Sequence, residues 1–291
     1  MARKMLDRAG EDLGNIVDVG HINLRVPDQR LATLYYVTGL GLTRDPFLMT
    51  GVDNMWVNVG QSQFHLPTGE AAYAPRTVAG LVVPDRAALV ARLQKVAIDL
   101  AGTRFSWAAT NDAIELTCPW GNRARCHTPD PQRFGQMSLG MAYVEFEVPR
   151  GSLAGIGRFY EEMIGARQSM DADGQGPFLR VACGPGQALV FRETGAEPVI
   201  CQPHHIQIYV ADFSGPYENL WERDLISEES NRQQYRFENI VDLESGRTLF
   251  TIDHEVRSMT HPMFGRPLIN RNTSQTAGTY RSGADAAQIW I

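Results

Sequence analysis

Two short segments of the chain, residues 20–28 and 204–212, share one pattern of hydrophobic and polar positions. In both segments apolar and polar residues alternate, which is typical of a β-strand with one buried face and one polar face. The apolar positions are Ile22, Leu24 and Val26 in the first segment and Ile206, Ile208 and Val210 in the second. A histidine, His21 or His205, begins the polar face of each predicted strand. Two such strands lining one cavity would bring both imidazoles together, which raises the question of a metal.

The end of this strand pattern recurs at intervals of roughly 60 residues, which indicates four copies of one module. The predicted first strands are residues 22–26, 80–83, 144–148 and 206–210. A helix is predicted after each strand, because apolar residues then follow at spacings of three and four. These helical stripes are Leu31, Leu34, Tyr35 and Thr38; Leu89, Val90 and Leu93; Ile156, Phe159, Tyr160 and Met163; and Phe213, Tyr217, Leu220 and Trp221. Gly39 and Gly165 are expected to end the first and third helices.

Short strands separated by turns are predicted after each helix. They cover residues 55–59, 63–66, 114–118, 123–127, 178–182, 188–191, 239–243 and 248–252, with 47–49 as a weak candidate for an earlier strand. Each module is therefore a strand, a helix and three strands, and the fold class is α+β. The modules occupy residues 17–70, 76–130, 138–195 and 200–258, which gives an N-terminal half (17–130), a C-terminal half (138–258) and a tail (259–291).

Composition and charge narrow the classes of function. The chain has 33 acidic and 27 basic residues, a net charge of −6, and no basic stripe, which argues against a nucleic-acid surface. No apolar run is long enough to span a bilayer, and the basic start lacks the apolar core of a signal peptide, so a cytoplasmic protein is expected. The four cysteines have no C-x-x-C spacing and are expected to be reduced and mostly buried: Cys118, Cys126, Cys183 and Cys201.

The four modules, the motif His-Ile-x-Ile/Leu-x-Val-x-Asp at two module starts, and Pro-Trp-Gly-Asn-Arg at residues 119–123 together resemble the vicinal oxygen chelate superfamily. That superfamily includes glyoxalase I, extradiol ring-cleaving dioxygenases, fosfomycin-resistance enzymes and bleomycin-binding proteins. The resemblance covers roughly residues 17–258. It implies that βαβββ modules pair into two cupped mixed sheets, with metal ligands from the first and last strands of the paired modules.

The resemblance places candidate ligands in the first and fourth modules. The first-strand ligand positions are His21, Val78, Tyr143 and His205, and the last-strand positions of the first three modules are His65, Arg125 and Val190. In the fourth module, Phe250 and Ile252 are expected to be buried, which leaves Thr251, Asp253 and Glu255 on the opposite face. Asp253 is the preferred carboxylate ligand and Glu255 the second choice, although a register shift of one residue would change this assignment.

Two arrangements of the modules follow from the resemblance. If the third and fourth modules pair, as in extradiol dioxygenases, the cup contains only His205, with Tyr143 where a second histidine would be. If the first pairs with the fourth and the second with the third, as in fused glyoxalase-I-like chains, His21, His65 and His205 converge. The second arrangement predicts one divalent ion per chain, Fe, Mn, Zn or Ni, and a second pair of modules without metal.

Other polar residues share the predicted face with the histidines. Candidate substrate-binding residues are Asn23, Arg25, Gln207 and Trp56, and candidate catalytic residues are Asp253, Glu255 and Tyr209. A solvated or hydrogen-bonded cavity wall is an equal alternative for Asn23, Arg25, Gln207 and Tyr209, and Trp56 is of a type that more often lines a core or cavity. Isolated histidines are more often hydrogen-bonded than ligating, and we expect this for His127 and His204, with His254 and His261 at the surface or in the tail.

The predicted function is that of a metal-dependent enzyme for a small substrate with neighbouring oxygens, by glyoxalase-like lyase or isomerase chemistry. The alternatives are an extradiol-type dioxygenase acting on a catechol-like ring and a non-catalytic binding or resistance protein. No nucleic-acid or membrane partner is expected. The apolar end of the tail, Gln288-Ile289-Trp290-Ile291, is expected to wrap the domain or pack on a partner, for example in a homodimer.

Overall fold

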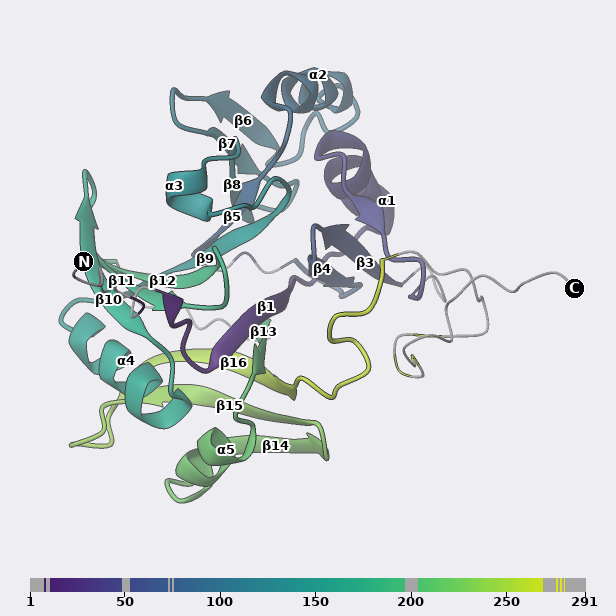
Figure 1. The fold of residues 1–291 in the computed structure, drawn as a ribbon. Helices are drawn as coiled ribbons and strands as arrows, with labels where there is room; N and C mark the ends of the chain where they lie inside the picture. The colour runs from purple at the N-terminus through teal and green to yellow at the C-terminus, as the bar shows by residue number, and fades with distance from the viewer. Residues whose placement is uncertain are drawn as a thin grey trace, which may run out of the picture.

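The computed structural model describes residues 8, 11–48, 53–72, 74, 76–196, 204–268, 276, 278 and 280. Two eight-stranded mixed sheets make up this part of the chain, with the helices on their outer sides (Figure 1). The α+β class and the predicted pair of cupped sheets are confirmed. No helix in the described ranges is long and apolar enough to cross a membrane.

The first sheet combines strands from the first and fourth modules. Its order is β14, β15, β16, β13, β1, β4, β3 and β2. In that order the strands span Ile226–Asn231, Gln234–Val241, Thr248–Ser258, His205–Val210, Ile16–Asn23, Ser62–Pro67, Asn54–Val59 and Thr43–Arg44. At the centre, β1 is antiparallel to β13 and parallel to β4, and β13 is parallel to β16. The predicted pairing of the first module with the fourth is confirmed.

The second sheet combines strands from the second and third modules in the order β10, β11, β12, β9, β5, β8, β7 and β6. These strands span Gln168–Asp173, Gly176–Ala182, Ala188–Thr194, Gly140–Pro149, Thr77–Val82, Arg123–His127, Ile114–Thr117 and Ser106–Ala109. The strands β5 and β9 are antiparallel at its centre, as β1 and β13 are in the first sheet. The two sheets are therefore built on one plan.

The helices follow the predicted apolar stripes. They are α1 and η2 (Gln29–Ala32, Thr33–Gly39), α2 (Arg86–Val96), α3 (Pro131–Phe134), α4 and η3 (Leu153–Phe159, Tyr160–Ile164) and α5 (Ser214–Trp221). Asp28, Asp85 and Asp130 cap α1, α2 and α3 by accepting backbone N–H groups. Helix α2 packs against η2, and α5 against η3. Each contact joins a helix of one sheet to a helix of the other, which ties the two sheets together.

The ends of two helices test the predicted glycine caps. Gly165 has φ of 72° and ends η3 in the left-handed conformation, which confirms that prediction. In the first module η2 does end at Gly39, but Gly39 is not left-handed, and the positive φ, 76°, occurs at Gly41. The cause is a wider turn, in which the N–H of Leu40 donates to the carbonyl of Tyr35, five residues earlier, at 2.9 Å.

Some strands were misplaced or missed. The strand predicted at 47–49 is wrong for residues 47 and 48, and residue 49 lies outside the described ranges. Phe47 lies in a turn, because the carboxylate of Asp45 accepts its backbone N–H at 2.8 Å. The outermost strands β10 and β14 were not predicted. Their residues are almost all polar and exposed, so hydrophobic periodicity gives no signal for them.

The cup of the second sheet is filled by protein. The phenol of Tyr143 lies 3.1 Å from Nη1 of Arg125 and 3.0 Å from Nε2 of His127, and Arg125 also donates to Glu115 at 2.7 Å. The ring of Tyr143 covers Gly80, where a Cβ would overlap it. Within the described ranges, this sheet has no group of three metal-binding side chains.

Substitution of Gly80 by alanine is therefore expected to destabilise the protein by about 1–3 kcal/mol, because the added methyl group must displace the packed, half-buried ring of Tyr143. Gly174→Ala is the matched control, since nothing lies within 4 Å of its Cβ position. Urea unfolding of the two variants measures the difference. Equal urea midpoints for the two variants would show that the ring of Tyr143 moves aside without loss of stability.

The chain after β16 turns back over the first sheet. Residues 259–268, which we call the strap, reach the inner face of the cup, where the rings of Phe264 and Tyr209 lie 4.9 Å apart. This part of the tail packs on its own chain, whereas the apolar end 288–291 lies outside the described residues. Among the cysteines, Cys118, Cys126 and Cys183 are free and buried as expected, and Cys201 is also outside the described residues.

Candidate metal centre

Three histidines meet on the inner face of the first sheet. His21 projects from β1, His65 from β4 and His205 from β13, and one ring nitrogen from each lies within 4.8 Å of the other two. The Nε2 atoms of His21 and His205 are 3.0 Å apart. The alternation of the sequence causes this, because Ile22 and Ile206 pair on the buried face while their neighbours face inward.

The environment of His65 fixes its ring and leaves one nitrogen free. Its Nδ1 lies 2.9 Å from the amide nitrogen of Asn23, and the indole of Trp56 stacks on the ring at 3.9 Å. Nε2 of His65 is buried and has no hydrogen-bond partner. A buried imidazole nitrogen without a partner, beside two further imidazoles, has the donor chemistry of a metal ligand. Asn23 and Trp56, two candidate substrate-binding residues, both lie against this histidine.

Burial keeps the three imidazoles neutral. It lowers the pKa of His65 to about 3 and that of His205 to about 2, and the pKa of His21 also lies well below its usual range. The nearby guanidinium groups of Arg236 and Arg257 lower these pKa values further. Neutral imidazole is the form that binds metals, so the site does not require deprotonation at pH 7.

The two candidate carboxylates lie beside the histidines on β16, where the predicted register is found. His205 pairs with Asp253, and Gln207 with Glu255. Glu255 is the nearer to a histidine nitrogen, with Oε2 3.6 Å from Nε2 of His205. Neither carboxylate joins the group of three histidines within 4.8 Å.

Both carboxylates are held by arginines. Arg236 contacts Oε2 of Glu255 and lies 2.5 Å from Oδ2 of Asp253, and Arg257 lies 2.5 Å from Oε1 of Glu255. Both oxygens of Glu255 are therefore in ion pairs, although its Oε1 has no hydrogen-bond partner, whereas Oδ1 of Asp253 is buried with neither an ion pair nor a hydrogen bond to a described residue. Burial raises the pKa of Asp253 to about 6 despite the opposing effect of Arg236. Of the two, Asp253 has the oxygen that remains available.

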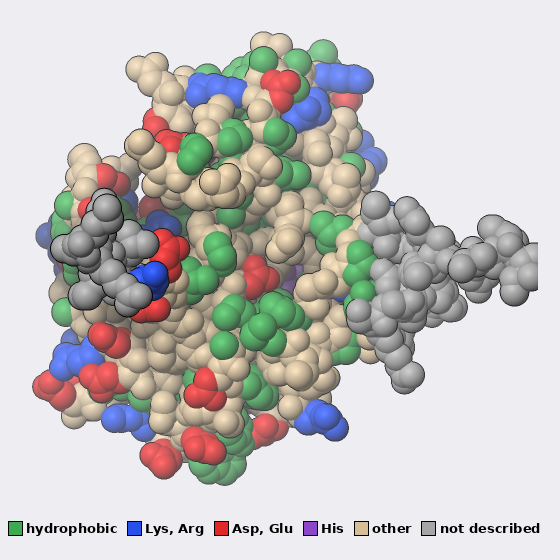
Figure 2. All heavy atoms as spheres, in the orientation of Figure 1, with side chains coloured by type: hydrophobic (Ala, Val, Ile, Leu, Met, Phe, Trp, Pro, Cys, Tyr) green, Lys and Arg blue, Asp and Glu red, His purple; other side chains and the backbone are tan. Residues whose placement is uncertain are grey.

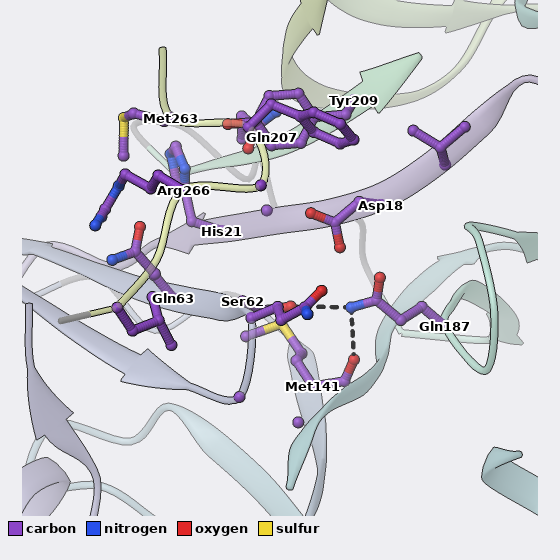
Figure 3. Close-up of a pocket in the computed structure, with 18 of the residues that line it drawn as sticks. Asp18, His21, Ser62, Gln63, Met141, Gln187, Gln207, Tyr209, Met263 and Arg266 are labelled. Atoms are coloured by element: carbon purple, nitrogen blue, oxygen red, sulfur yellow. Dashed lines mark hydrogen bonds between the residues drawn. The ribbon is translucent and has the colours of Figure 1, made fainter. Parts of the chain in front are cut away.

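A cavity of about 730 Å³ adjoins this cluster. Its walls come from β1, from the turn between β3 and β4, from residues 136–141 at the start of β9, from β13, and from the strap. Figure 3 shows Asp18 and His21 projecting from β1, with Gln207 and Tyr209 on one side and Gln187 on the other. On the face drawn in Figure 2, hydrophobic side chains gather near the middle and charged ones lie mainly around the edge.

Sequence-based candidates occupy different places around this cavity. Gln207 and Tyr209 line it, whereas Arg25 lies beyond the end of β1, is exposed, and does not line it. Sequence analysis missed Asp18 and Arg266, which do line it. The charge of Arg266 gave no signal, because its place depends on where the strap packs.

Four other histidines lie outside the cluster. His127 bonds with Tyr143, and Nδ1 of His204 lies 2.8 Å from the carbonyl of Asn23, as expected for hydrogen-bonded histidines. His254 was expected at the surface, which is wrong, because its side chain is fully buried. It stacks on Phe237 at 4.1 Å on the outer face of β16. His261 is half-buried in the strap.

The described residues form two eight-stranded sheets of paired modules, with a cluster of three histidines in one of the two cups. No protein-family model matches the sequence, and no curated protein matches it either.

Solved structures are similar to the chain in fold. Glyoxalase I from Zea mays aligns with a TM-score of 0.57 and 12% identity over 84% of this chain and 92% of its own. A Bacillus subtilis protein described as a "putative dioxygenase" aligns with a TM-score of 0.55 and 13% identity over 91% of this chain and 90% of its own. At these identities the likeness establishes the fold alone.

Proposed function

We propose that the protein is a metal-dependent enzyme that acts on a small molecule with two neighbouring oxygens, by glyoxalase-like proton transfer. One observation carries this proposal: three neutral imidazoles, two of them buried and that of His65 half-buried, converge within 4.8 Å beside a cavity of about 730 Å³. His21, His65 and His205 would hold the ion, and the chemistry it supplies when bound is polarisation of the two substrate oxygens.

The surrounding side chains have separate roles in this proposal. Asn23 and Trp56 orient His65 through the 2.9 Å contact at Nδ1 and the stacked ring. Asp253 is the residue proposed to move a proton, because its Oδ1 is buried without a partner. Arg236 and Arg257 fix Glu255 and balance its charge. The filled cup of the second sheet supports the protein without taking part in the reaction.

A ring-cleaving dioxygenase is the second candidate. It is favoured by the combination of histidine nitrogens with a carboxylate, Glu255, at 3.6 Å from His205, since histidines with one carboxylate suit an oxygen-activating metal. The two candidates are separable by their use of O2.

Activity assays with purified, metal-loaded protein distinguish the candidates. With an α-hydroxycarbonyl compound, glyoxalase-like chemistry predicts that the proton on the hydroxyl-bearing carbon next to the carbonyl exchanges in D2O, which NMR follows, without consumption of O2. A dioxygenase predicts O2 uptake with catechols. Binding of either class of compound without exchange or uptake would contradict both enzymes and leave a binding protein.

Metal content gives a prediction that is independent of substrate. The protein is expected to carry one divalent ion per chain, because only the first sheet has a group of ligands within the described ranges. Elemental analysis of protein purified without added metal, and again after loading with Zn, Mn, Ni or Fe, measures this. A value near two, or no binding of any of the four ions, would contradict it.

A further inference from the structure

The carboxyl group of Asp18 faces the cavity without a partner. Asp18 lies on β1, on the same side as His21, and Figure 3 draws no hydrogen bond to it. No ion pair or hydrogen bond joins its side chain to any described residue. Burial raises the pKa of Asp18 to about 7, and no neighbouring cation or hydrogen-bond donor opposes that shift.

Gln187 and Ser62, two hydrogen-bond donors that line the same cavity as Asp18, already have partners. The amide nitrogen of Gln187 donates to Oγ of Ser62 and to the carbonyl of Met141, each at 2.9 Å. The hydroxyl of Ser62 donates to the carbonyl of Val19 at 2.7 Å. These hydrogen bonds fix the side chains of Gln187 and Ser62 in the cavity wall. The carboxyl group of Asp18 therefore remains available to a ligand in the cavity.

Asp18 is also the unbalanced charge of the cavity. The other charged residues that line it are Arg257 and Arg266, and each is paired, with Glu255 and Asp45 respectively. Between Asp18 and the histidines lies Gln207, which is fully buried and whose amide oxygen and nitrogen both lack a hydrogen-bond partner. Buried polar groups without partners are uncommon in folded proteins, and here they line one cavity.

We propose that Asp18 binds a protonated amine of the substrate, while Gln207 hydrogen-bonds the part of the substrate between that amine and the two oxygens at the histidines. This inference rests on the proposed function for the oxygen end only. A cation supplies what the site lacks, since it would balance an unpaired carboxylate and donate hydrogen bonds to it.

The spacing along the strands fits a short substrate. Asp18 pairs with Tyr209 and His21 with Gln207, two residues apart on β13. Two residues of a strand span about 7 Å, which is the reach of an aromatic ring with a two-carbon amine side chain. The hydrophobic part of such a molecule would contact Met137, Met141 and Phe264.

Two pairs of probes test the amine site and the oxygen site separately. Dopamine is compared with 4-ethylcatechol, and 2-phenylethylamine with 2-phenylethanol, by calorimetric titration under nitrogen of protein with and without metal. Wild-type protein is expected to bind each amine at least about tenfold more tightly than its partner compound, since hydrogen bonds to charged groups are strong. Asp18→Asn should remove this preference. Asp99→Asn, which removes the same charge at an exposed position, should retain it.

The outcomes separate this inference from the proposed function. A tenfold preference for amines in metal-free protein supports the role of Asp18 even if metal does not improve catechol binding, which would contradict only the proposed metal function. Improved binding of both catechols with metal, but no preference for amines, overturns the role of Asp18. The inference is also overturned if wild-type protein binds none of the probes, or if the folded Asp18→Asn variant keeps the preference.

Discussion

Replacement of His205 by alanine is expected to abolish metal binding and activity while the fold is retained. Strand β13, which begins at His205, pairs with β1 through Ile206 and Ile208. Their buried side chains are not altered by the substitution. Loss of a residue that only hydrogen-bonds to a metal ligand lowers metal affinity by up to about 100-fold. Loss of one of the three ligands themselves should therefore lower it by more than about 100-fold. Metal content and a thermal melt measure the two effects.

Tyr143→Phe is the matched control in the other cup. Tyr143 occupies the place in β9 that His205 occupies in β13, yet among the described residues its hydroxyl bonds with Arg125 and His127 alone. Removal of its hydroxyl should lower stability by about 1–2 kcal/mol and leave metal content unchanged. If the His205→Ala protein keeps its metal, or the Tyr143→Phe protein loses it, the site lies elsewhere.

Replacement of Arg266 by methionine is expected to destabilise the protein by about 3–5 kcal/mol, because it leaves a buried carboxylate without its cation. Arg266 reaches from the strap to Asp45, whose side chain is fully buried and also accepts from the amide of Gln63 at 2.6 Å. The guanidinium group lies over the ring of Phe47, 4.7 Å from its centre. Urea unfolding measures the loss, which the pair Arg266→Met with Asp45→Asn should reduce.

Arg158→Met provides the comparison for that measurement. Arg158 pairs with Glu244 at the surface, where the two side chains are 39% and 78% exposed. Exposed ion pairs contribute about 0–1 kcal/mol, so this variant should unfold close to the wild type. If Arg266→Met lowers the free energy of unfolding by less than about 1 kcal/mol, Asp45 becomes hydrated when the strap is altered. The strap is then not held in place by this ion pair.

The two sheets show how one module plan supports two outcomes. At the centre of the first cup, His21 and His205 face each other across β1 and β13. In the second cup, Gly80 and Tyr143 pair across β5 and β9, and the phenol fills the space above the glycine. A large ring over a residue without a side chain closes the second cup, whereas imidazoles of moderate size leave nitrogens directed into the first.

The sequence by itself determined the modules and the three histidines. The period of two in residues 20–26 and 204–210 identifies which residues share a face of the sheet, and the helical stripes give the order of elements, because both signals come from local spacing. The same spacing placed Asp253 and Glu255 on the inner face of β16, where they are found. Edge strands such as β10 gave no signal, because their exposed polar residues carry no period.

Only the tertiary structure decided which groups meet at the cavity. A strict period of two would place Asp18 and His21, three residues apart, on different faces of the sheet. A bulge in β1 between Val19 and His21 shifts the alternation, so that both residues line the cavity and Asp18 pairs with Tyr209. The ion pair of Arg266 with Asp45 joins residues 221 positions apart. Local spacing cannot encode such contacts, because they depend on how the sheets and the strap pack in three dimensions.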